Sequence, residues 1–215
     1  MEIKHLGIIP DGNRRWAREN NVTYEKAYDL FSNHICNIIK EVNKNNIEML
    51  TFYVVSKENL KRNNSDVFDV LQSVKNMLQK KLPSVAKQLN IQVKCIGIDS
   101  VGNDELIEAA KYIESFCKTN TGMTVNLLIG YNPFDEINDI VCKGQKISIH
   151  NLSVPQYVDV LIRTAGGPVR LSNFLPLQCG YANIEVMENK FLDVKCEAII
   201  SAFKKYKNVN PNYGK

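Results

Sequence analysis

The sequence lacks the features that define several common classes of protein. Its six cysteines are scattered, and no two have the C-x-x-C spacing of a zinc site or a redox motif. This pattern argues against a disulfide scaffold and is typical of free thiols in the reducing cytosol. No apolar run approaches the length of about 18 residues that a membrane helix needs, and the short N-terminal run is followed at once by charge, unlike a secretory signal. We therefore expect a soluble, cytoplasmic protein without a transmembrane segment.

A strong charge imbalance is also missing. The net charge of +4 is mild and suits an anionic small molecule at least as well as nucleic acid, whose binders usually carry a stronger basic bias. We therefore expect no nucleic-acid partner. Hydrophobic residues make up 44% and charged residues 23%, which excludes disorder as the main state. With 215 residues, no internal repeat and no low-complexity linker, we expect one domain over residues 1–215.

Strand-like and helix-like segments alternate along the chain. Short apolar, β-branched runs predict strands at 6–9, 49–55, 91–96, 124–129, 158–162 and 184–187. Apolar residues at helical spacing predict helices at 14–45, 66–81, 104–116, 134–141 and 195–205. This alternation predicts an α/β fold with a mostly parallel sheet of about six strands and helices on both faces.

Polar clusters follow several of the predicted strands. They lie at 10–16, 56–62, 130–132 and 163–172. Ligands of such sheets bind outside the carboxyl ends of the strands, so we expect these clusters to share one rim. Arginines, glycines and hydroxyls on one rim favour a diphosphate site, although each cluster alone is equally consistent with an ordinary loop.

The first cluster has a specific chemical logic. Gly12 permits a sharp turn, and the amides of residues 12–15 would lie at a helix N-terminus, which favours an anion. Arg14 and Arg15 can bind phosphate oxygens. Asp11 among these positive charges suits a divalent cation carried by the phosphates. A tight turn, a helix cap and two solvated arginines would explain the same residues.

Three motifs resemble those of a known family. The stretch H-L-G-I-I-P-D-G-N-R-R-W-A at 5–17 closely resembles the first signature of the cis-prenyltransferases, the undecaprenyl and dehydrodolichyl diphosphate synthases, which is usually H-x-x-x-I-x-D-G-N-x-R-[WY]-A. Residues 56–62 resemble their second signature, S-x-E-N-W-x-R. Residues 159–164 and 170–175 resemble the third, D-L-x-I-R-T-G-G-E-x-R-x-S-N-F. The motifs keep the family order, keep nearly the family spacing and span the chain.

The resemblance implies an enzyme, a prenyltransferase with the cis-prenyltransferase fold. In this family an allylic diphosphate ionises with the help of Mg²⁺, and the alkene of a second prenyl diphosphate attacks the cation. The implied substrates are prenyl diphosphates (dimethylallyl, isopentenyl or longer allylic ones), and the implied assembly is a homodimer formed through helices late in the fold.

The resemblance also implies residue roles. Asp11 would bind the magnesium-diphosphate and assist its departure, and Asn59 would act with Ser56 near the reacting carbons and the proton to be lost. Substrate binding would involve Gly12, Asn13, Arg14, Arg15, Trp16, Tyr28, Ser56, Arg62, Arg163, Arg170 and Ser172. Within this group, Arg163, Arg170 and Ser172 would hold the diphosphate of the second substrate.

The sequence departs from the family pattern at several positions. Where the family has R-x-x-G-H, this chain has Y-E-K-A-Y at 24–28, and one extra residue lies within 163–170. Asn183 occupies the place of the strand glutamate that helps to bind magnesium, and we expect Glu185, on the same strand face, to compensate as a metal ligand. The C-terminal R-x-G of the family is replaced by N-Y-G at 212–214.

These departures resemble the lavandulyl-type members, which join prenyl units head-to-middle with dimethylallyl diphosphate as acceptor. We therefore expect condensation of an allylic diphosphate with a second five-carbon prenyl diphosphate, including head-to-middle condensation. The alternatives are ordinary head-to-tail cis elongation with isopentenyl diphosphate and a role as one subunit of a heteromeric cis-prenyltransferase. A plain diphosphate-binding module is a further alternative, which the motifs disfavour.

Overall fold

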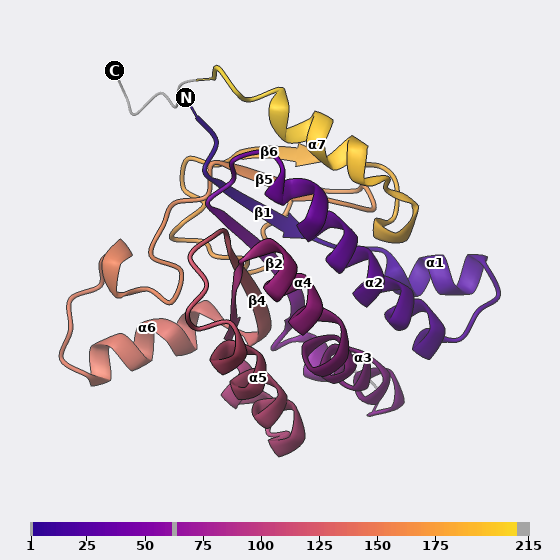
Figure 1. Ribbon diagram of the computed structural model, residues 1–215, viewed down its shortest axis with the longest axis horizontal. Coiled ribbons are helices and arrows are strands. Elements are labelled where there is room, and N and C mark those ends of the chain that lie inside the picture. The colour runs from indigo at the N-terminus through magenta and orange to yellow at the C-terminus, as the bar shows by residue number, and fades with distance from the viewer. Residues whose placement is uncertain (1, 62–63, 210–215) are drawn as a thin grey trace.

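A six-stranded sheet forms the centre of the molecule (Figure 1). The computed structural model describes residues 2–61 and 64–209. The strands are β1 His5–Ile9, β2 Met49–Ser56, β3 Gln92–Ile96, β4 Thr124–Tyr131, β5 Val160–Arg163 and β6 Asn183–Val186. They are ordered β3-β4-β2-β1-β5-β6, and every neighbouring pair is parallel. The predicted α/β fold with a parallel sheet is confirmed.

Helices connect the strands. The α-helices are α1 Asn13–Glu19, α2 Tyr24–Asn43, α3 Asn64–Asn76, α4 Leu82–Leu89, α5 Asp104–Phe116, α6 Pro133–Cys142 and α7 Cys196–Lys204. Short 3₁₀ turns occur at Asn59–Lys61, Ile98–Val101, Ile149–Asn151 and Phe191–Asp193, and a π-helical segment at Met77–Lys81 joins α3 to α4. Within the described residues, no helix combines the length and the apolar character needed to cross a membrane.

The two faces of the sheet are covered differently. Alternate side chains of each strand point to opposite faces, so Phe52 and Leu127 join the larger apolar cluster while Tyr53 and Leu128 join the smaller one. The larger cluster packs against α2, α3, α4, α5 and α7. The smaller cluster packs against irregular segments that contribute Val154, Val158, Phe174, Leu175 and Cys179.

Two predicted helices differ from the structure. The helix predicted over 14–45 is broken between α1 and α2, where Asn21 has a φ of 53° and the Thr23 hydroxyl accepts a hydrogen bond from the Lys26 amide to begin α2. The helix predicted over 66–81 does not end there but continues through the π-helical segment into α4. Pro83 lies in the first turn of α4, where its missing N–H costs little, so it does not stop the helical path.

A buried polar network fastens the centre of the sheet. His5 Nε2 lies 2.8 Å from the Thr51 hydroxyl, which also accepts a hydrogen bond from Asn126 Nδ2 at 3.0 Å. The other ring nitrogen of His5 lies 3.1 Å from the Tyr157 carbonyl oxygen. Burial in this network lowers the pKa of His5 from 6.5 to about 4, because desolvation disfavours the charged imidazole.

Stability should therefore fall as the pH drops through this range. The unfolded chain takes up a proton at His5 near pH 6.5, whereas the folded chain does so only near pH 4. The stabilisation is present above the unfolded pKa, and roughly 3 kcal/mol of unfolding free energy is lost as the pH falls to the folded value. Urea unfolding above and below this window measures the loss. The free energy of unfolding of His5→Gln should depend less steeply on pH than that of the wild type. An unchanged pH dependence in this variant would show that His5 is not the group responsible.

Candidate active site

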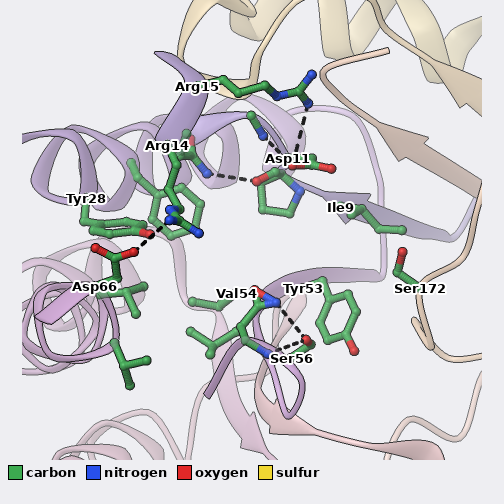
Figure 2. A pocket seen from close by; sticks show the side chains of 18 of the residues that line it. Ile9, Asp11, Arg14, Arg15, Tyr28, Tyr53, Val54, Ser56, Asp66 and Ser172 are labelled. Carbon is green, nitrogen blue, oxygen red and sulfur yellow. Dashed lines mark hydrogen bonds and ion pairs between the residues drawn. The ribbon is translucent and has the colours of Figure 1, made fainter. Parts of the chain in front are cut away.

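A cavity of about 440 Å³ lies at the carboxyl ends of β1, β2 and β5 (Figure 2). Ten of the residues predicted from the sequence line it: Asp11, Gly12, Asn13, Arg14, Arg15, Tyr28, Ser56, Asn59, Arg163 and Ser172. The other lining residues are Ile9, Pro10, Arg18, Phe31, Tyr53, Val54, Val55, Asp66, Val67 and Val70. Strand ends far apart in the sequence therefore share one rim, as the parallel topology requires.

Asp11 lies in the turn between β1 and α1. One carboxylate oxygen, Oδ1, accepts a hydrogen bond from the Gly12 amide, and Oδ2 lies 3.0 Å from Arg163 Nη2. Arg15 Nη2 is 4.0 Å from Oδ1. Gly12 has a φ of 98°, and a Cβ at this position would lie 2.7 Å from the Cβ of Ala165, so both the conformation and the close approach require glycine.

Arg163 is held at the end of β5 by three neighbours. Its Nη2 contacts Asp11, and its Nη1 donates hydrogen bonds to the Ser172 hydroxyl at 3.0 Å and to the Arg170 carbonyl oxygen. The fourth polar cluster of the sequence, residues 163–172, thus folds around the guanidinium of Arg163. The side chain of Arg170 is exposed and is not among the lining residues, so this residue contributes its carbonyl group to the arrangement.

The segment after β2 brings Ser56 and Asn59 together. The Asn59 amide and Nδ2 both donate hydrogen bonds to the Ser56 hydroxyl, at 3.2 and 2.9 Å. Figure 2 shows Ser56 at the lower edge of the cavity, and the pairing holds Asn59 beside it. The predicted binding residue Arg62 and the C-terminal segment 212–214 lie outside the described residues.

Glu58 connects the second polar cluster to Asn132 of the third and to Asn173, directly after the fourth. Its Oε1 accepts hydrogen bonds from Asn173 Nδ2 at 3.2 Å and from Asn132 Nδ2 at 3.4 Å. Partial burial acts to raise the pKa of the Glu58 carboxyl, but hydrogen bonds from its own backbone, Ser56 and Asn173 outweigh it and lower the pKa. The sequence analysis matched Glu58 to the second signature, two residues after Ser56, but assigned it no role.

The opposite wall contains an ion pair that the sequence did not predict. Arg14 Nη2 lies 2.8 Å from Asp66 Oδ2, which joins the start of α1 to α3. The guanidinium of Arg14 also lies over the ring of Tyr24, 5.4 Å from its centroid. Asp66 and Arg18 come from outside the three motifs, so no sequence pattern pointed to them.

Polar atoms without partners gather in this cavity. Within the described residues, five buried side-chain nitrogen or oxygen atoms have no hydrogen-bond partner, and four of them belong to lining residues: Asn13 Oδ1, Arg14 Nε, Tyr53 Oη and Arg163 Nε. Leaving such atoms unpaired costs stability, so their concentration favours a polar ligand. Because four arginines face two aspartates in the lining, that ligand should be an anion.

Besides Arg170, the predicted residues Trp16 and Glu185 are also not brought to the cavity. Trp16 Nε1 donates a hydrogen bond to Asp193 Oδ1 at 2.7 Å, outside the lining. The Glu185 carboxylate accepts hydrogen bonds from Lys205 Nζ and from the Tyr206 hydroxyl instead of joining Asp11. Glu185 therefore does not lie beside Asp11 within one chain, and its role as a magnesium ligand stays a prediction. Asn183, at the amino end of β6, bonds to the Asp159 carbonyl oxygen.

The donor set still fits one magnesium ion carried by a diphosphate. Within the described residues, no cluster of three or more His, Cys, Asp or Glu side chains could hold a metal without help. Mg²⁺ needs no such cluster, because it is commonly bound by one or two carboxylates together with substrate phosphates and water. Asp11, with 43% of its side chain exposed, is the carboxylate placed for this role.

Fold and site together define an α/β protein with a cavity suited to an anion at the carboxyl edge of a parallel sheet. A model of the family described as putative undecaprenyl diphosphate synthase matches residues 9–214. The chain therefore belongs to this family and is a prenyltransferase that uses prenyl diphosphates.

Individual relatives agree with this assignment. An isoprenyl transferase of Clostridium tetani is 32% identical over an alignment of 232 residues. The alignment includes 98% of this chain and 89% of that protein. An isoprenyl transferase of Campylobacter jejuni is 29% identical over 222 residues, 100% of this chain and 99% of that protein.

Two crystal structures share the fold. A lavandulyl diphosphate synthase from Lavandula x intermedia, in complex with dimethylallyl diphosphate, has a TM-score of 0.89 at 25% identity, covering 99% of this chain and 98% of that chain. A probable undecaprenyl diphosphate synthase from Campylobacter jejuni has a TM-score of 0.79 at 26% identity, covering all of both chains.

Proposed function

We propose that the protein condenses an allylic diphosphate with isopentenyl diphosphate in a head-to-tail reaction. The observation that carries the proposal is one cavity in which Asp11, Arg15 and Arg163 face an apolar wall that includes Phe31 and Val70. Such a cavity suits a ligand with an anionic head and an apolar tail. The relatives named isoprenyl transferase favour this ordinary condensation over more specialised ones.

In the proposed reaction, the C–O bond to the allylic diphosphate breaks and a C–C bond forms to the alkene carbon of the second substrate. The attack leaves a positive charge on the neighbouring alkene carbon, and a proton then leaves the carbon adjacent to that charge. Arg15 and Arg163 stabilise the negative charge on the departing diphosphate, and fixed charges of this kind act most strongly where charge develops. Mg²⁺, held by Asp11 and the diphosphate oxygens, would supply further charge stabilisation.

Ser56 and Asn59 are placed to serve the last step. Their hydrogen-bonded pair lies across the cavity from Asp11, at the end of β2 (Figure 2). A hydroxyl and an amide in this position can orient the second substrate and guide the departing proton toward the released diphosphate. The apolar side chains of α2 and α3 exclude water, which would otherwise capture the allylic cation.

A second candidate reaction is head-to-middle condensation with dimethylallyl diphosphate as acceptor. It is favoured by the likeness to the lavandulyl diphosphate synthase, whose structure contains dimethylallyl diphosphate. It is also favoured by Tyr28 in the cavity lining, at a position where the resembling family usually has histidine.

Product analysis distinguishes the two reactions. Purified protein with Mg²⁺ would be incubated with dimethylallyl diphosphate alone, and then with labelled isopentenyl diphosphate added. Linear products that appear only when isopentenyl diphosphate is present would support head-to-tail elongation. A branched product from dimethylallyl diphosphate alone, identified by mass spectrometry and NMR, would replace it with the head-to-middle reaction. No condensation product under either condition would refute both.

We also propose that two copies of the chain associate, as the family resemblance implies. Exposed apolar side chains lie near the edge strand β6, at Tyr157, Leu177, Tyr181 and Ile184. The segments that carry them are joined by backbone hydrogen bonds from Val158 to Gln178 and from Asn183 to Asp159. We expect light scattering to give the mass of a dimer, and we expect its interface to bury more than about 1,000 Å². A monomeric protein with full activity would contradict this proposal.

A further inference from the structure

The apolar part of the cavity is short. It is formed by Tyr28 and Phe31 from the first two turns of α2, by Val67 and Val70 from the first two turns of α3, and by Val54 near the end of β2. Figure 2 shows Tyr28 on the side of Asp66, and Val54 beside Tyr53 and Ser56. The polar rim of Asp11 and Arg163 thus faces a wall built only from the ends of these elements.

The cavity does not continue to the next helical turn. Ile35 follows Phe31 on α2, Val74 follows Val70 on α3, and Phe52 precedes Val54 on the same face of β2. All three are fully buried members of the core, and none lines the cavity. One helical turn is about 5.4 Å, so the core closes the cavity within roughly that distance of Phe31.

Phe31 is held in place from behind. The Phe191 ring packs against it with centroids 5.4 Å apart, and the Tyr28 ring lies edge-to-face with it, with centroids 6.5 Å apart. The Phe191 backbone amide donates a hydrogen bond to the Asp11 carbonyl oxygen at 3.0 Å, which couples this support to the first motif. Packing against these two rings restricts the rotation of the Phe31 ring.

The joint between α2 and α3 is also fixed. The Ser73 hydroxyl donates a hydrogen bond to the Tyr28 carbonyl oxygen at 2.6 Å and lies 2.7 Å from the Ser32 hydroxyl. Both serines are buried, so these bonds are shielded from water. The two helices therefore cannot separate at this level without breaking buried hydrogen bonds.

We propose that Phe31, supported by Tyr28 and Phe191, is the floor that limits the prenyl chain to one or two isoprene units. The inference rests on the proposed prenyl transfer and specifies its substrate class. A volume of about 440 Å³ lies near the lower end for small-molecule pockets, and here it must also accommodate the diphosphate. The chain thus makes short products, although its family is described by the long-chain undecaprenyl synthases.

The test compares starters of increasing length. The full-length protein would be given labelled isopentenyl diphosphate and an allylic diphosphate of one, two or three isoprene units, and the products would be sized by mass spectrometry. For the wild type we expect kcat/KM with the three-unit starter to be at least about tenfold lower than with the one-unit starter. Phe31→Ala should remove most of this difference and lengthen the products.

Matched variants distinguish a specific effect of Phe31 on product length from the effect of a general loss of packing. Phe203 on α7 is as well buried as Phe31 but does not line the cavity, so Phe203→Ala should leave product length unchanged. Phe31→Leu, a smaller change, serves if Phe31→Ala does not fold, and it should shift product length in the same direction. An equal shift in Phe203→Ala would overturn the proposal.

The proposal and the proposed function fail in different ways. Wild-type products longer than three units would refute the floor while leaving prenyl transfer intact. If no starter gives product, the proposed function fails. Calorimetry then tests the role of Phe31 separately, by measuring the affinity of the wild type for each of the three starters. The floor then requires the three-unit diphosphate to bind no more tightly than the one-unit diphosphate, and tighter binding would overturn it.

Discussion

Replacing Asp11 with asparagine is expected to lower kcat by about 10²- to 10³-fold while the protein stays folded. The carboxylate of Asp11 is the acidic group that faces Arg15 and Arg163 at the rim of the cavity. Asparagine keeps the shape and can still accept the Gly12 hydrogen bond, but it lacks the negative charge that a magnesium-diphosphate requires. Steady-state kinetics at saturating Mg²⁺ and substrate measure the loss, and thermal unfolding checks the fold.

Asp29→Asn is the matched control for this variant. Asp29 is also an exposed aspartate in an ion pair, 2.6 Å from Lys81 Nζ, but it does not line the cavity. Its replacement should change kcat by less than a factor of about two, because surface ion pairs contribute little and this one is remote from the substrate. Wild-type kcat in Asp11→Asn would show that Asp11 balances the charge of Arg163 and takes no part in the reaction.

The sheet could be predicted because its signals are local. A run such as residues 49–56 is apolar on both faces, and such runs form strands covered on both sides in parallel sheets. The helix boundaries were harder to predict because they depend on single residues. The break at Asn21 rests on one left-handed residue, and the passage from α3 to α4 rests on a π-helical segment before Pro83.

The site could be predicted in part because parallel strands place their carboxyl ends on one edge. Clusters that follow β1, β2 and β5 therefore met around Asp11, Ser56 and Arg163. Strand periodicity did not predict the surroundings of Glu185. The alternation of side chains shows which face of the strand a residue is on, but not which neighbours cover that face. Lys205 and Tyr206, which bind the Glu185 carboxylate, come from beyond the end of α7.

Residues supplied by other elements could not be found from motifs. Asp66 reaches Arg14 because α1 and α3 both pack against α2 beside the cavity, and Phe31 becomes a lining residue because α2 borders the same cavity. In the sequence Phe31 belongs to an amphipathic helix, in which an apolar position gives no sign of whether it faces a core or a cavity. Asp66 reads as an acidic residue in the first turn of a helix, where such residues are common. Tertiary packing determines this difference.

Arg163→Lys should lower kcat/KM by about a hundredfold, although the charge is kept. The guanidinium contacts Asp11 through Nη2 and Ser172 through Nη1, and a single ammonium group cannot make both contacts in the same geometry. Only 14% of the Arg163 side chain is exposed, so water cannot freely replace the contact that lysine would lose. Displacement of a positioning group by about 1 Å can cost a hundredfold in rate.

Arg170→Ala provides the comparison, because the sequence assigns both arginines to the diphosphate of the second substrate. In the structure Arg170 contributes its carbonyl oxygen to Arg163, which alanine preserves, while its side chain is exposed outside the cavity lining. We therefore expect kcat/KM to fall by at most about tenfold, as for a rim charge that assists encounter, with a loss that shrinks at high salt. Measured side by side, a greater loss in Arg170→Ala than in Arg163→Lys would reverse the assignment and make Arg170 the principal diphosphate ligand.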